Sequence, residues 1–483
     1  MKPGLNYVNA AWRPSRTGKT FAQHNPADLS DRTGLHQDSD VEDVREAIAA
    51  AQAAYPAWRA TPPPERARLL RRVLAAMQAR ADEVAACITR ENGKTLDESH
   101  AEIQSAVAEM DFQVSEGLRL YGTTVPSGKP GVLAYTIRQP LGVAAIITPW
   151  NFPWNVPTRK ATPALMAGNT VVLKPASLTP GVGRLFADLF AEAEFPPGVV
   201  NFVTGRGGDI GRELVDNAAV QAVSFTGSTS VGHAIQQAAA RTLTRTQLEM
   251  GGKNAAVVLA DADVDLAARA CAQAAFACAG QWCTSTSRAI VEAPVYDAFA
   301  DKITAHARAL RLGDGRKTAT DMGPVCGERQ LEGILSHIED GKSADATVLC
   351  GGARATDGPL ARGCFVAPTV FGDVAPDMSI ARHEIFGPVL CLMRAQSFAH
   401  AMDLANDVAY GLSSSVFTRD VSAALRFVEG TEVGLTHVNV MTAYKEPSLC
   451  FGGTKESGAG LPEAGHTGIE FFTREKAVYI GYA

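Results

Sequence analysis

Short β-branched segments alternate with helical segments from Leu141 onward, and this alternation restricts the fold more than any other feature of the sequence. The β-branched runs predict strands at Val143–Thr148, Thr170–Lys174, Val199–Val203, Ala222–Thr226 and Ala255–Leu259. The segments between them space their apolar residues as helices do, at Arg159–Ala167, Val182–Glu194, Gly208–Asn217 and Val231–Ala240. Strands separated by short helices predict a parallel, doubly wound α/β sheet, which binds ligands at the carboxyl ends of its strands.

The rest of the chain predicts further units, as expected for 483 residues, which are too many for one ordinary core. Helical periodicity precedes the strands at Val41–Trp58, Pro64–Asn92 and Glu98–Leu120. A second alternating series runs from Ser287 to about Val440 and includes strands at Arg288–Val291, Val389–Met393 and Ser413–Phe417. This series predicts a second α/β domain.

Two short strand-like segments, Gly131–Arg138 and Lys476–Ile480, lie outside both series. Edge strands of this kind are usually covered, and pairing with another subunit is one way to cover them. We therefore expect a homo-oligomer, and the sequence leaves homodimer and homotetramer open.

Charge and composition exclude several classes of protein. The net charge is -6, with 45 basic and 51 acidic side chains, and no basic run is dense enough to follow a phosphate backbone. No window approaches the roughly 18 apolar residues of a membrane helix, and Met1–Pro14 lacks the pattern of a secretory signal. The nine cysteines include no Cys-x-x-Cys pair and no nearby histidines at zinc spacing. We expect a cytoplasmic protein with no nucleic-acid partner, no membrane and no metal.

Three polar residues sit in loops where chemistry could occur. Cys283 follows a helix in Gly280-Gln-Trp-Cys283-Thr-Ser285, where a thiolate could act as a nucleophile, although a structural cysteine is as common in such a segment. Glu249 precedes Gly251 and Gly252 and could act as a general base, the alternative being a surface glutamate before a turn. Asn151 lies between two prolines after a strand, where its amide could stabilise an oxyanion or simply shape a turn.

Two strand ends could receive a dinucleotide. The run Ala222–Gly232 is a strand, a small-residue turn and a helix start, which presents free N–H groups to a phosphate. Lys174 and Ser177 follow the strand Thr170–Leu173, where a ribose lies in such sheets. An acidic residue there would repel a 2′-phosphate, and Ser177 would not. NADP should therefore be accepted besides NAD.

Five motifs, in order along the whole chain, make the sequence resemble the aldehyde dehydrogenase superfamily. They are Thr148-Pro-Trp-Asn-Phe-Pro153, Leu248-Glu-Met-Gly-Gly-Lys253, Gly280-Gln-Trp-Cys283, Glu384-Ile-Phe-Gly-Pro-Val389 and Phe451-Gly-Gly-Thr-Lys-Glu-Ser-Gly458. The resemblance implies a Rossmann-type cofactor domain over residues 1–118 and 141–250 and an α/β catalytic domain over residues 251–450. It also implies an oligomerisation β-element over residues 119–140 and 466–483.

The resemblance also implies a role for each motif. Cys283 would attack the aldehyde carbon, Asn151 would stabilise the oxyanion, and Glu249 would activate the water that hydrolyses the thioester. Lys160 would support a proton relay from Glu249. The remaining residues would contact the cofactor, and they are Thr148, Pro149, Trp150, Lys174, Ser177, Gly227, Ser228, Gly251, Glu384 and Phe386.

The sequence departs from the usual pattern of the family in three places. Ser177 replaces the common glutamate. Cys450 stands where a proline commonly precedes Phe-Gly-Gly. The usual Gly-Arg-Glu run is altered and one residue longer near Leu461-Pro462-Glu463, so Glu463 is our candidate for the relay carboxylate.

The substrate is predicted to be an ω-semialdehyde acid such as 2,5-dioxopentanoate or succinate semialdehyde. The segment Thr158-Arg159-Lys160 resembles one that offers an arginine to a far carboxylate, and an arginine fork matches a carboxylate. A companion arginine is missing at Ala277, and Lys445 could compensate for it. Trp282 and Thr284 flank the nucleophile and complete the expected substrate-binding residues.

Other interpretations of the substrate and of the activity remain open. Phe152, Trp154, Phe276 and Trp282 could line a tunnel for an aromatic or aliphatic aldehyde, and Arg159 could be a helix-surface residue. A catalytically silent relative would lack the nucleophile or the base, and both are present. Transfer of the thioester to coenzyme A is disfavoured because Glu249 is retained.

Overall fold

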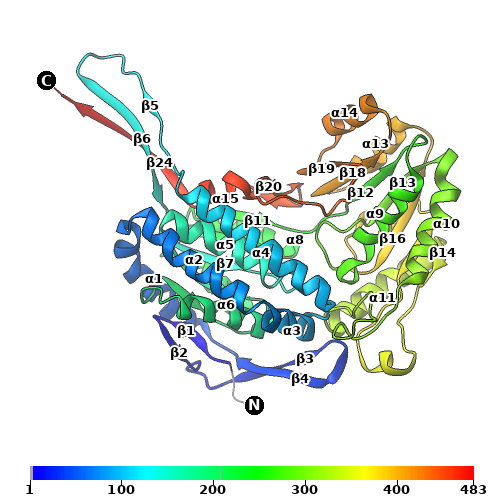
Figure 1. The fold of residues 1–483 in the computed structure, drawn as a ribbon, viewed down its shortest axis with the longest axis horizontal. Coiled ribbons are helices and arrows are strands. Elements are labelled where there is room, and N and C mark those ends of the chain that lie inside the picture. The colour runs from blue at the N-terminus through cyan, green and yellow to red at the C-terminus, as the bar shows by residue number, and fades with distance from the viewer. Residues whose placement is uncertain (1–3, 207, 483) are drawn as a thin grey trace.

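The computed structural model describes residues 4–206 and 208–482. Two large sheets lie in the two halves of the molecule, and a narrow three-stranded sheet projects from the first half (Figure 1). The strand orders are β2-β1-β9-β8-β7-β10-β11-β22 and β14-β15-β16-β13-β12-β18-β19 for the large sheets and β24-β6-β5 for the projecting one. This is the mixed α/β architecture that the alternating pattern predicts.

The first sheet has a parallel centre, from β9 to β11, with antiparallel strands added at both edges. Its strands are β1 (Asn6–Val8), β2 (Ala11–Arg13), β7 (Val143–Ile147), β8 (Thr170–Lys174), β9 (Val200–Phe202), β10 (Val220–Thr226), β11 (Arg245–Glu249) and β22 (Gly458–Ala459). Its helices are α1 (Val41–Ala60), α2 (Pro63–Ala79), α3 (Ala81–Asn92), α4 (Leu96–Gly117), α5 (Asn155–Ala167), α6 (Pro180–Glu192), α7 (Gly208–Asp216) and α8 (Thr229–Ala239).

Burial on both faces explains the continuous apolar runs of the central strands. In β7, Ala144 and Ile146 join the core beneath α2 to α6, whereas Val143, Ala145 and Ile147 join the core beneath α1, α7 and α8. The predicted helix Pro64–Asn92 is two helices, because the chain leaves helical geometry at Arg80. The strands β1, β2 and β11 were missed, since they are short and mix polar with apolar residues.

The second sheet joins strands from the second half of the chain. From β15 to β19 in the order given above, each strand pairs in parallel with its neighbour. Its strands are β12 (Ala255–Val258), β13 (Arg288–Glu292), β14 (Thr347–Cys350), β15 (Thr369–Gly372), β16 (Val389–Ala395), β18 (Ser413–Phe417) and β19 (Leu435–Val438). Its helices are α9 (Val264–Phe276), η1 (Ala277–Gly280), α10 (Ala293–Ala309), α11 (Glu328–Ser343), η2 (Gly358–Arg362), α12 (Ser379–Arg382), α13 (Phe398–Asn406) and α14 (Val421–Gly430).

The C-terminal segment returns to the first half of the molecule. After α15 (Gly465–Phe471), β24 (Thr473–Gly481) pairs along its whole length with β6 (Val132–Pro140), and β5 (Thr124–Val125) covers part of the other edge of β6. Both segments were predicted as outlying strands. The remaining short strands are β3 (Thr20–Asn25), β4 (Asp28–Gln37), β17 (Tyr410–Gly411), β20 (Cys450–Phe451), β21 (Thr454–Lys455) and β23 (Glu463–Ala464).

Candidate active site

A cavity of about 380 Å³ brings together six of the predicted site residues. Its wall is built from α4, α5, the loop after β7, the ends of β10 and β11, the turn after η1 and the loop before β20. The predicted residues that line it are Asn151, Arg159, Glu249, Trp282, Cys283 and Lys445. These residues come from segments far apart in the sequence, so the cavity exists only in the complete fold.

Cys283 reaches the cavity because a left-handed turn ends η1. Cys278, Ala279 and Gly280 have φ angles of 52°, 53° and 68°. A Cβ on Gly280 would lie 2.1 Å from the carbonyl oxygen of Gly387, so only glycine fits there. Burial raises the pKa of Cys283 to about 12, although the charge of Arg159 opposes this rise. The side chain is therefore a thiol at neutral pH and needs a proton acceptor when it attacks.

Glu249 supplies such an acceptor at the end of β11. Its side chain is buried, and its Oε2 has no hydrogen-bond partner among the described residues. Burial, and then repulsion from Glu463, raise the pKa of Glu249 well above its ordinary value. Such a carboxyl group can take up a proton near neutral pH.

Asn151 faces the same cavity from the loop after β7. Its Nδ2 donates to the carbonyl oxygen of Gln281, two residues before Cys283, at 3.1 Å. An amide nitrogen carries two N–H groups, so one remains for another acceptor. The hydrogen bond holds this donor beside the nucleophile turn.

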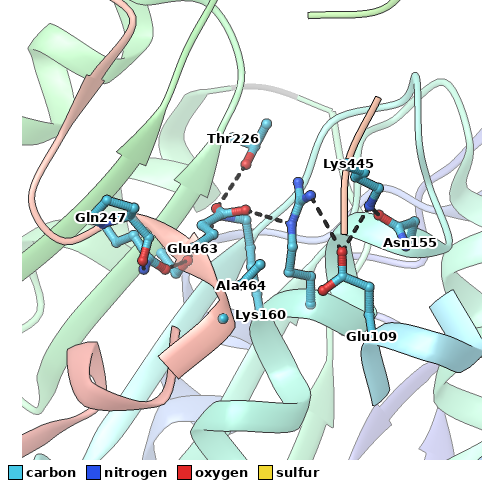
Figure 2. A network of polar contacts seen from close by, with 12 residues as sticks. Glu109, Asn155, Lys160, Thr226, Gln247, Lys445, Glu463 and Ala464 are labelled. Atoms are coloured by element: carbon cyan, nitrogen blue, oxygen red, sulfur yellow. Dashed lines mark hydrogen bonds and ion pairs between the residues drawn. The ribbon is translucent and has the colours of Figure 1, made fainter. Parts of the chain in front are cut away.

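Glu463 on β23 contacts both basic residues of α5, Arg159 and Lys160, and Figure 2 shows it facing Thr226. Its Oε1 forms an ion pair with Lys160 Nζ and accepts from Thr226 Oγ1 at 3.3 Å, and its Oε2 accepts from Arg159 Nε at 2.9 Å. Burial opposes its ionisation, but Lys160 and Arg159 hold the pKa of Glu463 below its usual value. Burial lowers the pKa of Lys160, and Glu463 counteracts that effect.

Hydrogen bonds between side chains continue from Lys160 to Ser224 and Gln247. Lys160 Nζ donates to Ser224 Oγ at 2.9 Å, and Ser224 Oγ donates to Gln247 Oε1 at 2.8 Å. Lys160 is fully buried and is not among the cavity-lining residues. Glu463 is not among the cavity-lining residues either.

Lys445 lies on the cavity wall in the loop before β20. Its Nζ donates to Glu109 Oε1 at 2.8 Å and to Asn155 Oδ1 at 3.0 Å (Figure 2). Glu109 was not found from the sequence; the available signal was its place on the buried face of α4. Thr284 is buried, its carbonyl accepts from Thr442 Oγ1 at 2.7 Å, and it is not among the cavity-lining residues.

The expected cofactor residues lie at carboxyl ends of the first sheet and where the two halves meet. Lys174 ends β8, and its Nζ donates only to its neighbour's carbonyl, at 3.4 Å, among the described residues. Burial lowers the pKa of Lys174 to about 8. Ser228 caps α8 without a side-chain hydrogen bond to that helix, so the first N–H groups of the helix remain free. These features fit a ribose and a pyrophosphate.

Glu384 and Phe386 lie on the other side of this region. Glu384 Oε1 accepts from the backbone N–H of Gly252 at 2.9 Å, and burial raises the pKa of Glu384 to about 7. A Cβ on Gly251 would lie 2.0 Å from Glu384 Oε2. Phe386 meets Trp150 edge to face, with ring centroids 5.5 Å apart. Gly251 therefore leaves space for the Glu384 carboxylate, which can accept hydrogen bonds from ribose hydroxyl groups.

Comparison with known proteins decides the family. The model of the aldehyde dehydrogenase family matches residues 12–478. This chain belongs to the aldehyde dehydrogenase family. The resemblance inferred from the motifs, and with it the fold class, is thereby confirmed, as is the expectation of an NAD(P)-dependent enzyme that oxidises an aldehyde.

Individual family members are similar over nearly their whole length. An alpha-ketoglutaric semialdehyde dehydrogenase of Bacillus subtilis is 41% identical, over 99% of this chain and 98% of the relative. A succinate-semialdehyde dehydrogenase [NADP(+)] of Escherichia coli is 38% identical, over 98% and 97%. The structure of an aldehyde dehydrogenase from Bacillus cereus in complex with NAD+ matches with a TM-score of 0.96 and 33% identity, over 99% of this chain and 97% of that one.

No helix in residues 4–206 and 208–482 is both long and apolar enough to cross a membrane. Within the same residues, no group of three or more His, Cys, Asp or Glu side chains could hold a metal ion.

Proposed function

We propose that this aldehyde dehydrogenase oxidises an ω-semialdehyde acid, such as 2,5-dioxopentanoate or succinate semialdehyde, to the corresponding dicarboxylate. The observation that carries the proposal is the presence of two cationic side chains, Arg159 and Lys445, on the wall of the cavity that contains Cys283. Two cations with free donors on one side of a cavity favour a substrate with a carboxylate at the far end from its aldehyde. The names of the relatives from Bacillus subtilis and Escherichia coli agree with that chemistry.

In the proposed reaction, Cys283 Sγ attacks the aldehyde carbon and forms a thiohemiacetal. The thiol proton passes to Glu249, whose raised pKa suits it as an acceptor. The free N–H of the Asn151 amide and the backbone N–H of Cys283 stabilise the negative charge on the substrate oxygen. A nicotinamide cofactor held by Lys174, Ser228 and Glu384 would supply the hydride acceptor that turns the thiohemiacetal into a thioester on Cys283.

Hydrolysis of the thioester requires a base and a route for its proton. Glu249 first releases the thiol proton along that route, and its Oε2, which is unpartnered among the described residues, then accepts a proton from the attacking water. We propose that Glu463 and Lys160 form the next part of the route, since Glu463 contacts Lys160 and hydrogen-bonds Thr226 at 3.3 Å. Thr226 is the residue of β10 that pairs with Glu249.

We assign the cofactor contacts as follows. Lys174 and Ser177 hold the adenine ribose, and a 2′-phosphate is tolerated there because no carboxylate occupies position 177. Gly227 and Ser228 border the pyrophosphate, Glu384 binds the nicotinamide ribose, and Phe386 packs beside the ring. Thr148, Pro149, Trp150 and Gly251 shape the space around the nicotinamide, and Trp282 flanks the substrate, whereas Thr284 lies outside the cavity wall.

We also propose how the chain is divided and assembled. Residues 1–118 and 141–250 bind the cofactor, residues 251–450 form the catalytic domain, and residues 119–140 and 466–483 form the oligomerisation element of a homodimer or homotetramer. Support comes from exposed apolar side chains on the projecting sheet, which are Val125, Leu133, Ile137, Tyr479 and Ile480. We infer a cytoplasmic setting because all nine cysteines are free.

The experiment that tests the substrate proposal measures kcat/KM with NAD and with NADP for 2,5-dioxopentanoate, succinate semialdehyde, benzaldehyde and hexanal. We expect the acidic semialdehydes to be oxidised fastest, and Cys283→Ala to abolish turnover of all four. Aromatic or aliphatic aldehydes are the second candidate class, because Phe152 and Trp282 form an aromatic pair at the cavity, with ring centroids 5.2 Å apart. Higher kcat/KM for benzaldehyde or hexanal would establish that class instead.

A further inference from the structure

The starting observation is a buried carboxylate that touches both cations of the proposed substrate site. Glu109 of α4 accepts from Lys445 Nζ at 2.8 Å, and its Oε1 lies 3.9 Å from Arg159 Nη1. The Glu109 side chain is only 1% exposed. Figure 2 shows Glu109 and Lys445 facing each other on the side of the network opposite Glu463.

Glu109 is incompletely satisfied where it lies. Its Oε2 is buried and has no hydrogen-bond partner among the described residues. A buried carboxylate oxygen without a partner has lost its hydration without a replacement hydrogen bond, which destabilises the folded state. Lys445 alone would be satisfied by the amide oxygen of a glutamine, so the negative charge of Glu109 is the feature that requires an explanation.

Arg159 and Lys445 retain N–H groups that make no hydrogen bond among the described residues. Lys445 Nζ has three N–H groups and donates to Glu109 and Asn155. Arg159 donates through Nε to Glu463, while its terminal nitrogens make no hydrogen bond among the described residues. The Arg159 guanidinium carbon lies 4.3 Å from the centre of the Phe451 ring, which also lines the cavity. Free donors of both cations are therefore available to an anion in the cavity.

The charges on this wall leave one positive charge without a partner. The cations are Arg159, Lys160 and Lys445, and the carboxylates are Glu109 and Glu463. Among the described residues, Glu249 forms no ion pair with any of these three cations. Two carboxylates that do line the cavity, Glu98 and Glu102, have partners of their own nearer the start of α4. There, Glu98 accepts from the backbone N–H of Cys278, and Glu102 pairs with Lys94.

We propose that Glu109 is a specificity-determining residue, which offsets one of the two cations at the tail of the substrate site and so selects aldehydes with a single carboxylate. This inference rests on the proposed function and deepens it. Without the charge of Glu109 the wall would carry two unpaired positive charges and would suit a tail with two carboxylates. With it, a single carboxylate completes the charge balance, and a second one would be buried without a partner.

The test compares three aldehydes in each enzyme: hexanal, succinate semialdehyde and (2-oxoethyl)malonate, which carry no, one and two carboxylates. Glu109→Gln removes the charge and retains an oxygen for Lys445. We expect its ratio of kcat/KM for (2-oxoethyl)malonate to that for succinate semialdehyde to rise about tenfold over wild type. The ratio is measured within one enzyme preparation, so it does not depend on the folded fraction. Asp111→Asn, an exposed carboxylate of the same helix, is the matched control and should leave the ratio unchanged.

A second pair of variants tests the same charge in the opposite direction. Lys445→Met should lower kcat/KM for succinate semialdehyde at least tenfold, because Glu109 is left beside the substrate carboxylate with one cation fewer. Adding Glu109→Gln to Lys445→Met should restore part of that loss. An unchanged ratio in Glu109→Gln, or no recovery in the double variant, would overturn the inference. If wild type prefers hexanal to succinate semialdehyde, the proposed function itself fails.

Discussion

Replacing Glu463 by glutamine removes one buried charge while keeping the side-chain volume, and its effect on Glu249 can be worked out from the structure. Glu463 hydrogen-bonds Thr226 at 3.3 Å, and Thr226 pairs with Glu249 on the neighbouring strand. The two carboxyl groups are therefore separated by about one strand spacing plus the length of a hydrogen bond, roughly 8 Å. At an effective dielectric of about 20, charges at that separation repel by about 2 kcal/mol, which is at least about one pKa unit.

The sign of the effect follows from the causes of the Glu249 pKa. Burial comes first and repulsion by Glu463 second, and both raise it. Glu463→Gln removes the second cause, so the pKa of Glu249 falls. If deprotonated Glu249 is the base, kcat/KM increases with pH as it ionises, and this acidic limb should move about one pH unit lower in the variant.

The assay is the pH profile of kcat/KM for the best aldehyde, with Glu102→Gln as the control. Glu102 pairs with Lys94 at 2.5 Å and is equally buried, so both variants break a buried ion pair. Each should destabilise the protein by about 3–5 kcal/mol. Only Glu463→Gln should move the acidic limb. A limb that stays in place in Glu463→Gln, or moves to higher pH, would refute the coupling between Glu463 and Glu249.

Three other changes have definite expected results. Gly251→Ala places a Cβ only 2.0 Å from Glu384 Oε2, so the Glu384 carboxylate must move. The KM for the cofactor should therefore rise about tenfold or more, while the KM for the aldehyde changes little. Initial rates at varied cofactor concentration measure this. Ser177→Glu should lower kcat/KM with NADP relative to NAD at least about tenfold, since a carboxylate would repel the 2′-phosphate. Arg288→Met leaves the carbonyls of Lys253, Leu404 and Ala405 without their donor, so unfolding in denaturant should need about 3–5 kcal/mol less.

The sequence predicted best those parts of the fold whose cause is local. The strand Thr170–Lys174 was predicted with its observed bounds, because a strand that is buried on both faces is a continuous apolar run. Strands β3 and β4 were missed, because they form a hairpin with alternating burial and many polar residues. The break at Arg80 was missed because helical periodicity continues across it.

The site was predicted unevenly for the same reason. Cys283, Glu249 and Asn151 stand in motifs that can be recognised one at a time, and all three line the cavity. Glu109 could not be found that way, because its importance depends on Lys445, which lies 336 residues further along the chain. The contact of Arg159 with Glu463 and its place on the cavity wall likewise exist only in the folded chain.

The position of Glu463 near the C-terminus has a consequence for how the protein is made. Lys160 is buried, and the carboxylate that balances it arrives on β23, 303 residues later in the chain. The same late segment supplies β24, which closes the sheet with β6. A nascent chain that has not yet released these residues holds an uncompensated cation in its core and an open strand edge. Folding of the first half is thus completed by the last residues, so contacts of long sequence separation govern its rate and its exposure to aggregation.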